Sequence, residues 1–160
     1  MAKPNTKPFI TVAAVCEKVL REPDGVFSAI RIVDILTLKE ELISPPANLP
    51  EGAQTVAAIQ ILNLTLLVAL KSGDVTGEHL IRVVMRDPND KTIPLPPGEL
   101  PVVLKGNDGA NYVLTFGLPL NARSGQYWFD VLWDGDVLTS VPLKLQREDA
   151  ANVSAPGAHS

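Results

Sequence analysis

The chain has 160 residues, a hydrophobic fraction of 46% and a formal net charge of −4 at pH 7. This length fits one domain with a substantial core, and the apolar content excludes disorder throughout. The acidic balance argues against proteins that bind nucleic acid or acidic membranes, because both classes need a basic surface. We therefore expect neither nucleic acid nor a membrane as a partner.

The single cysteine, Cys16, excludes an internal disulfide and fits a reducing compartment. The apolar stretch at 9–15 is too short for a signal peptide and runs directly into Glu17 and Lys18. The apolar stretch at 59–70 is interrupted by polar residues and is too short to span a bilayer. The sequence therefore predicts a cytoplasmic protein.

In chain order, the polar residues 1–8 predict a flexible N-terminal arm. Residues 9–22 alternate with a period of two and predict a strand, and residues 23–25 predict a tight turn. The Ile- and Val-rich residues 26–38 predict a second strand, paired with the first as a long hairpin. Residues 39–54 predict a long connection with three prolines, which is either functional or a crossover between sheets.

Further strands are predicted farther along the chain. For residues 55–71 a helix is the alternative, but the Thr and Val content and the turn that follows favour a strand. More strands are expected at 77–86, 99–105 and 110–118, with an extended proline-rich stretch at 92–98. Residues 147–160 are small and polar without periodicity and predict a disordered tail.

The strongest pattern is the hairpin GQYWFDVLWDGDVLTSVPLKL at 125–145. Tyr127 and Phe129 alternate with Trp128 along its first strand, and the Asp-Gly-Asp at 134–136 predicts its turn. Pro142 cannot donate to a ladder, so the returning strand is predicted to be an edge or to be bulged there. Together these segments predict an all-β domain over 9–146, an antiparallel two-sheet β-sandwich of about eight strands.

The closing pattern G-x-Y-x-F-x-V-x-x-D-G, together with PDGVFSAIRIVD at 23–34, resembles a family of short uncharacterised bacterial β-sandwich proteins of immunoglobulin-like or C2-like fold. The resemblance covers most of 9–145. It implies a fold and no known activity.

Acidic turns are the first candidate site. In an up-and-down order of strands, alternate connections fall at one end of a sandwich, and these connections carry five carboxylates: Asp24, Asp74, Asp108, Asp134 and Asp136. Such a pole could ligate a hard cation such as Ca²⁺. The alternative is that Asp and Gly are the usual residues of turns, and no D-x-D-x-D loop occurs.

A nucleophile is the second candidate. Cys16 is predicted to be a buried, inert thiol within a strand, and His79 is the one histidine outside the C-terminal tail. A catalytic pair requires hydrogen-bond contact between them, and nothing in the sequence brings them together. We therefore expect no catalytic activity and no cofactor.

The aromatic residues are the third candidate. Trp128 points opposite to Tyr127 and Phe129, whereas Trp133 continues the inner set at the turn. An outward Trp can be a platform for a sugar or a protein, with Trp133 and Arg123 as further binding candidates. The alternative is that Trp128 is covered by the 39–54 loop or packs beneath Arg123.

The function expected from the sequence is a non-catalytic protein–protein interaction or structural module, with a protein partner or a second copy as a homo-oligomer. The alternative is a ligand-binding sandwich, with a carbohydrate on Trp128 or calcium at the acidic turns.

Overall fold

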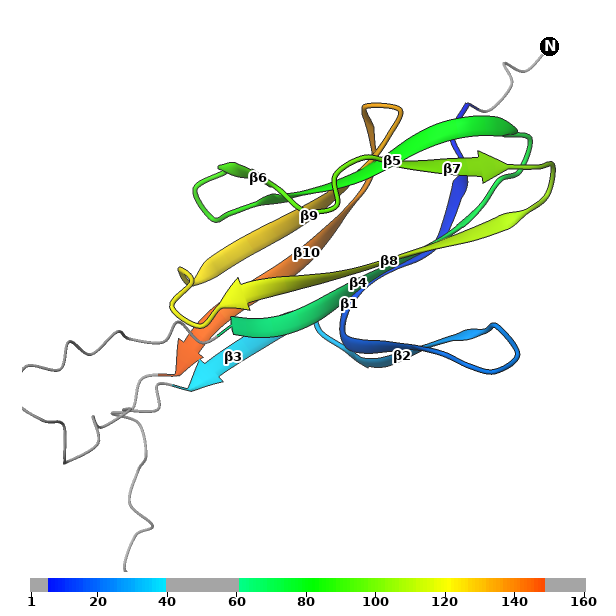
Figure 1. Cartoon of the computed structure of the whole chain (residues 1–160). Helices are drawn as coiled ribbons and strands as arrows, with labels where there is room; N and C mark the ends of the chain where they lie inside the picture. Colours follow the sequence, from blue (N-terminus) through cyan, green and yellow to red (C-terminus); the bar gives the residue numbers. More distant parts are fainter. Residues whose placement is uncertain (1–5, 40–60, 149–160) are drawn as a thin grey trace, which may run out of the picture.

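The computed structural model describes residues 6–39 and 61–148. These residues form ten strands and no helix (Figure 1). The strands are β1 (Phe9–Arg21), β2 (Phe27–Ile32), β3 (Ile35–Lys39), β4 (Ile61–Lys71), β5 (Gly77–Arg86), β6 (Thr92–Pro94), β7 (Leu100–Leu104), β8 (Gly109–Pro119), β9 (Gly125–Trp133) and β10 (Asp136–Glu148). Among the described residues, no helix is long and apolar enough to cross a membrane.

Two sheets contain these strands. The four-stranded sheet has the order β2-β1-β4-β8, and the six-stranded sheet has the order β3-β10-β9-β5-β6, with β7 also paired to β5. All strand pairs are antiparallel except β3 and β10, which run parallel. The predicted all-β, two-sheet class is confirmed. The prediction of about eight strands in purely antiparallel sheets is wrong, because the described residues hold ten strands and one parallel pair.

The predicted second strand is in fact two strands in different sheets. β2 pairs with β1, as predicted, whereas β3 crosses to the other sheet and joins β10. The crossing lies at Val33 and Asp34, where the carbonyl of Asp34 accepts the Lys144 amide at 2.8 Å and the Asp34 carboxylate accepts the Ile35 amide at 2.8 Å. A single Asp within a long apolar stretch does not predict, from the sequence alone, that the stretch forms two separate strands.

The β9–β10 hairpin has the predicted form. Two residues join the strands, and both Asp134 (φ 49°) and Gly135 (φ 87°) have the positive φ that a type I′ turn requires. Pro142 pairs with Trp128 of β9, and β3 joins β10 only from Lys144 onward. Among the described residues, Pro142 therefore lies where β10 has one neighbour, as its missing amide hydrogen requires, although β10 as a whole lies between β3 and β9 and is not the edge strand that was predicted.

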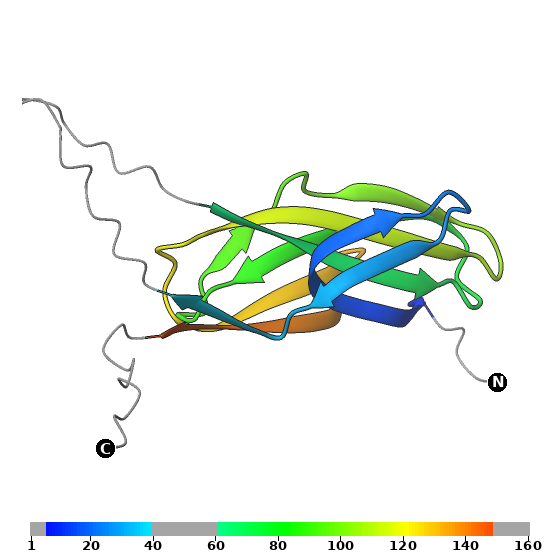
Figure 2. The same cartoon turned by 90° about the horizontal axis from the view of Figure 1, so that it is seen from below.

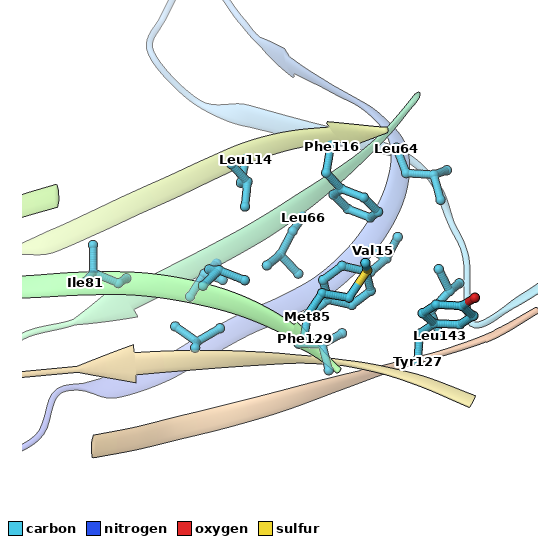
Figure 3. Packing of buried hydrophobic residues seen from close by; sticks show 14 of the residues in the cluster. Val15, Leu64, Leu66, Ile81, Met85, Leu114, Phe116, Tyr127, Phe129 and Leu143 are labelled. Carbon is cyan, nitrogen blue, oxygen red and sulfur yellow. The ribbon is translucent and has the colours of Figure 1, made fainter. Parts of the chain in front are cut away.

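The core lies between the sheets and consists of apolar side chains from alternating positions (Figure 3). β5 contributes Ile81, Val83 and Met85, which alternate along the strand. Phe116 of β8 meets Phe129 of β9 across the core, with ring centroids 4.6 Å apart. Burial of this continuous apolar layer is the main stabilising contribution to the fold.

The β1–β2 hairpin leaves the two-sheet body. In Figure 1 the blue hairpin bends away from β4 and β8 on the side opposite the six-stranded sheet, and in Figure 2, which is seen from below, it lies in front of them. On that side Cys16, Thr65 and Leu67 are buried, although none of them belongs to the core cluster between the sheets. We name residues 17–32 the apolar hairpin, because it also carries large apolar side chains outside the core.

The domain limits predicted from the sequence lie close to the described strands. β1 starts at Phe9, and β10 continues through Glu148, beyond the predicted end of the domain at 146. Arg147 donates to the carbonyls of Leu120 and Ala122, which ties this end of β10 to the β8–β9 connection. Apart from Lys39, the predicted 39–54 connection lies outside the described residues, as do residues 1–5, 55–60 and 149–160.

Candidate functional site

The acidic turns are engaged within their own loops. The carboxylate of Asp24 accepts the Val26 amide at 3.1 Å, and that of Asp108 accepts the Lys105 amide at 3.1 Å. The turn carrying Asp74 meets that of Asp108, where the Ser72 amide donates to the Asp108 carbonyl at 2.8 Å. Within residues 6–39 and 61–148, no three His, Cys, Asp or Glu side chains are placed to hold a metal ion. The geometry thus matches the use of Asp as a turn residue.

Asp134 and Asp136 have other partners. Asp134 accepts the Leu80 amide at 2.9 Å through one oxygen and contacts His79 Nδ1 at 2.7 Å through the other. The carboxylate of Asp136 lies 4.0 Å from the Lys7 ammonium; the Asp136 side chain is largely exposed and that of Lys7 is partly exposed. The sequence did not predict the Asp134–His79 pair, because 55 positions separate the two residues and only the β5–β9 pairing brings them together.

His79 is held at one end of the six-stranded sheet. Its Nε2 lies 3.1 Å from the Thr76 carbonyl, and its ring stacks on Trp133 with centroids 4.8 Å apart. The hydrogen bond with Asp134 raises the pKa of His79, partly opposed by burial. The same pair lowers the pKa of Asp134, together with the larger effect of the Leu80 amide. The arrangement therefore favours an imidazolium that braces the β9–β10 turn.

Cys16 and His79 are not brought together. Cys16 lies on β1 of the four-stranded sheet, whereas His79 lies on β5 of the six-stranded sheet. The predicted burial of Cys16 is confirmed: it is 0% exposed, and its thiol donates to the Thr65 carbonyl at 3.3 Å. Burial also raises the pKa of Cys16, which disfavours the thiolate that a nucleophile needs.

Trp128 lies on the outward side of the six-stranded sheet, as predicted, and it is half-buried. The cation near its ring is Arg86, whose guanidinium carbon lies 5.8 Å from the ring centroid. Arg123 donates to the Asn89 side chain at 3.0 Å, and its carbonyl accepts the Tyr127 hydroxyl at 2.8 Å. The contact described beside the Trp128 ring is thus with Arg86, and the alternative of packing beneath Arg123 stays a prediction.

Trp133 is a core residue. Only 2% of it is exposed, and it belongs to the cluster between the sheets. Its assignment to the inner set of β9 is confirmed. Its burial leaves Trp128 as the tryptophan that reaches the outward side of the sheet.

A network of charged and polar side chains lies next to Trp128, and the sequence did not predict it. The carboxylate of Asp130, a residue only 7% exposed, accepts Arg86 Nε at 2.6 Å and Nη2 at 3.0 Å. Ser140 donates to the same carboxylate at 2.6 Å, and Arg86 Nη1 reaches Asp90 at 3.0 Å. Arg86 and Ser140 hold the pKa of Asp130 below its usual value, and Asp130 and Asp90 raise the pKa of Arg86. We name Arg86, Asp130 and Ser140 the polar network.

The apolar hairpin has the opposite character. Val26, Ile30 and Ile32 are 58%, 39% and 67% exposed. Val19, Leu20 and Phe27 are half-buried, and none of these six residues belongs to the core cluster or packs against it. The charges of the hairpin balance, with three acidic and three basic residues in 17–32 and an exposed Arg31–Glu17 ion pair at 2.8 Å.

Comparison with known proteins identifies no family for this chain. No family model matches the sequence, and no curated protein matches it. Among solved structures, the chain resembles part of a β-glucosidase from Listeria innocua, with a TM-score of 0.42 and 11% identity over 87% of this chain and 16% of that one. The gluconolactone complex of the same enzyme gives a TM-score of 0.37 and 18% identity over 53% of this chain and 14% of that one. The matched regions span less than a fifth of the length of either solved structure.

Proposed function

We propose that this chain is a non-catalytic, immunoglobulin-like module of the cytoplasm that binds another protein through its apolar hairpin. The observation that carries the proposal is the group of large side chains on residues 17–32 that the core does not use. Apolar residues gathered on an element outside the core are typical of surfaces that are covered in a complex. The equal numbers of acidic and basic residues favour a partner with an apolar contact surface over a strongly charged one.

Two features support the immunoglobulin-like assignment. The neighbours β1-β4-β8 in one sheet and β10-β9-β5 in the other follow the A-B-E and G-F-C orders of that fold. In addition, the hydroxyl of Tyr127, near the start of β9, bonds the carbonyl of Arg123 four residues upstream. This contact has the form of a tyrosine corner, which occurs at the equivalent strand in immunoglobulin-like domains.

The absence of catalysis in this proposal is supported by the states of the candidate residues. Cys16 is buried and bonded to a backbone carbonyl, and His79 is engaged by Asp134 and Thr76. Trp128 has Arg86 near its ring, which supports a packing role over a free sugar platform.

Differential capture tests the proposal. The wild-type chain, a V26K/I32K variant and a matched V103K/V137K variant are immobilised and exposed to host lysate. All four positions carry exposed apolar side chains, at 58%, 67%, 64% and 52%, so both variants gain the same charge at solvent-facing sites. We expect proteins that are retained by the wild type and by V103K/V137K but lost with V26K/I32K. Equal retention by both variants, or no retention by the wild type, contradicts the proposal.

A further inference from the structure

β8 is an edge strand without the features that normally protect an edge. It pairs with β4 over eleven consecutive residue pairs with no break in register, and within the described residues it has no second neighbour. Its sequence, GANYVLTFGLP, contains no charged residue, and its one proline is the last residue. Exposed edges of this length present a row of unpaired amides and carbonyls that can pair with another strand.

The other edges of the described sheets are short or interrupted. β2 has six residues and carries Arg31 with a positive φ of 50°. β3 has five residues and ends in Lys39, β6 has three residues including Pro94, and β7 has five including Pro101. Short length, charge and proline are the devices that limit edge pairing in natural sheets. Among the described edges, β8 is the one that is both long and uncharged, and its proline stands only at its last position.

The sequence of β8 is complementary to itself about Val113. In an antiparallel pair centred there, Val113 lies opposite its own copy, and Asn111 lies opposite Thr115. These outward positions are exposed. The central pair places valine against valine, and each flanking pair places the Asn111 amide against the Thr115 hydroxyl, which also lies 3.4 Å from the Thr65 hydroxyl. Toward the core, the small Ala110 lies opposite the large Phe116.

We propose that two copies of this chain associate by antiparallel pairing of β8 with β8, centred on Val113. The pairing joins the two four-stranded sheets into one continuous sheet across a two-fold axis, the symmetry most common in homodimers. Because β8 is uncharged, two identical strands meet without like-charge repulsion. This contact uses a strand outside the apolar hairpin, so it holds or fails independently of the proposed function.

A cysteine cross-link tests the register. In the proposed pair the two Val113 Cα atoms are about 4.5–5.5 Å apart, within the range that a disulfide bridges. The two Thr115 Cα atoms are offset by four residues, about 14 Å along the strands, which is too far. Under mild oxidation of the full chain, V113C should form a covalent dimer and T115C should not. Cys16 is 0% exposed, so the wild type is the control without a reactive thiol.

Light scattering at increasing concentration provides the second measurement. The N111K/T115K variant places lysines opposite lysines in the proposed pair and should weaken the dimer about tenfold or more. V103K/V137K, with the same added charge, should dimerise as the wild type does. A monomeric wild type, equal cross-linking of V113C and T115C, or an N111K/T115K dimer as strong as the wild-type dimer overturns the inference. The two proposals are separated if V26K/I32K loses its captured partners but still dimerises, or if N111K/T115K no longer dimerises but still captures them.

Discussion

Two outward-facing regions, the surface around Trp128 on the six-stranded sheet and the apolar hairpin, differ in what they expose to solvent. On the six-stranded sheet, Trp128 lies beside Arg86, and Arg86 is fixed by Asp130, so the one large aromatic ring there is accompanied by a bonded cation. In the apolar hairpin, Ile32 is 67% exposed and Val26 is 58% exposed. Both regions lie outside the core. On the six-stranded sheet the charged groups bond to one another, whereas the apolar hairpin leaves apolar side chains exposed to solvent.

This difference assigns the polar network to stability and the apolar hairpin to binding. A buried carboxylate contributes to folding only while its partners remain, so the polar network should matter for stability. An exposed isoleucine contributes little to folding, because the unfolded chain exposes it as well. Substitutions in the polar network should therefore change the free energy of unfolding, whereas those in the apolar hairpin should change association.

Among substitutions outside the core, the largest effect is expected for Asp130→Asn. The amide keeps the shape but loses the charge that Arg86 and Ser140 bond, at a position only 7% exposed. We expect a loss of about 2 kcal/mol in the free energy of unfolding at pH 7, measured by urea denaturation. A change below about 0.5 kcal/mol would show that the network is not stabilising.

The pH dependence of this loss is a control. Contacts with Arg86 hold the folded pKa of Asp130 below its usual value of 3.8. The contribution of the carboxylate is thus present above pH 3.8 and disappears as the pH falls through the lower folded pKa. The difference in stability between the wild type and Asp130→Asn should shrink in that acidic range. A difference that stays constant with pH would point to altered packing.

A smaller effect is expected for Ser140→Ala. This change removes one hydroxyl that donates to the Asp130 carboxylate at 2.6 Å and leaves the two bonds from Arg86 in place. We expect a loss of about 1 kcal/mol, measured in the same denaturation experiment. In the double variant with Asp130→Asn, the two losses should add to less than their sum, because both act on one carboxylate. Strict additivity would argue against a shared network.

The fold of the six-stranded sheet was easier to predict than its chemistry. Alternation of Tyr127, Phe129 and Val131 and the Asp-Gly turn predicted the β9–β10 hairpin and its inward face, because both depend on neighbours in sequence. The Arg86–Asp130 pair joins residues 44 positions apart, and its existence depends on the register between β5 and β9. No local pattern encodes that register.

In the hairpin region, too, contacts between neighbours in sequence could be predicted and long-range contacts could not. The pairing of β1 with β2 could be predicted, since a tight turn at Asp24 and Gly25 joins two apolar strands. The transfer of β3 to the other sheet could not, because Val33 and Asp34 interrupt the run only briefly and the parallel pairing with β10 is a long-range contact. The exposure of Ile30 and Ile32 follows from how the hairpin leaves the two-sheet body, which period-two alternation does not determine.

The pKa of His79 tests whether His79 and Asp134 form an ion pair beside the β9–β10 turn. The hydrogen bond with Asp134 raises the pKa of His79 above 6.5, so its stabilisation is fully present below pH 6.5 and is lost as the pH rises through the raised value. Asp134 is 48% exposed, so this contribution should stay below about 1 kcal/mol.

An NMR titration measures this pKa directly, with His159→Ala assigning the second histidine. Asp134→Asn keeps an oxygen for the Leu80 amide and removes the charge, so the pKa of His79 should fall in that variant. A wild-type pKa at or below 6.5, or one that Asp134→Asn leaves unchanged, would contradict the ion pair.

The smallest effect on stability is expected for Ile32→Thr in the apolar hairpin. Because Ile32 is 67% exposed and outside the core cluster, its loss should change the free energy of unfolding by less than about 0.5 kcal/mol. Ile81→Thr is the matched control, since Ile81 is 0% exposed between the sheets and its replacement should cost about 2 kcal/mol or more. A large loss for Ile32→Thr would mean that the hairpin is needed for folding, and its apolar side chains would then need no partner to account for them.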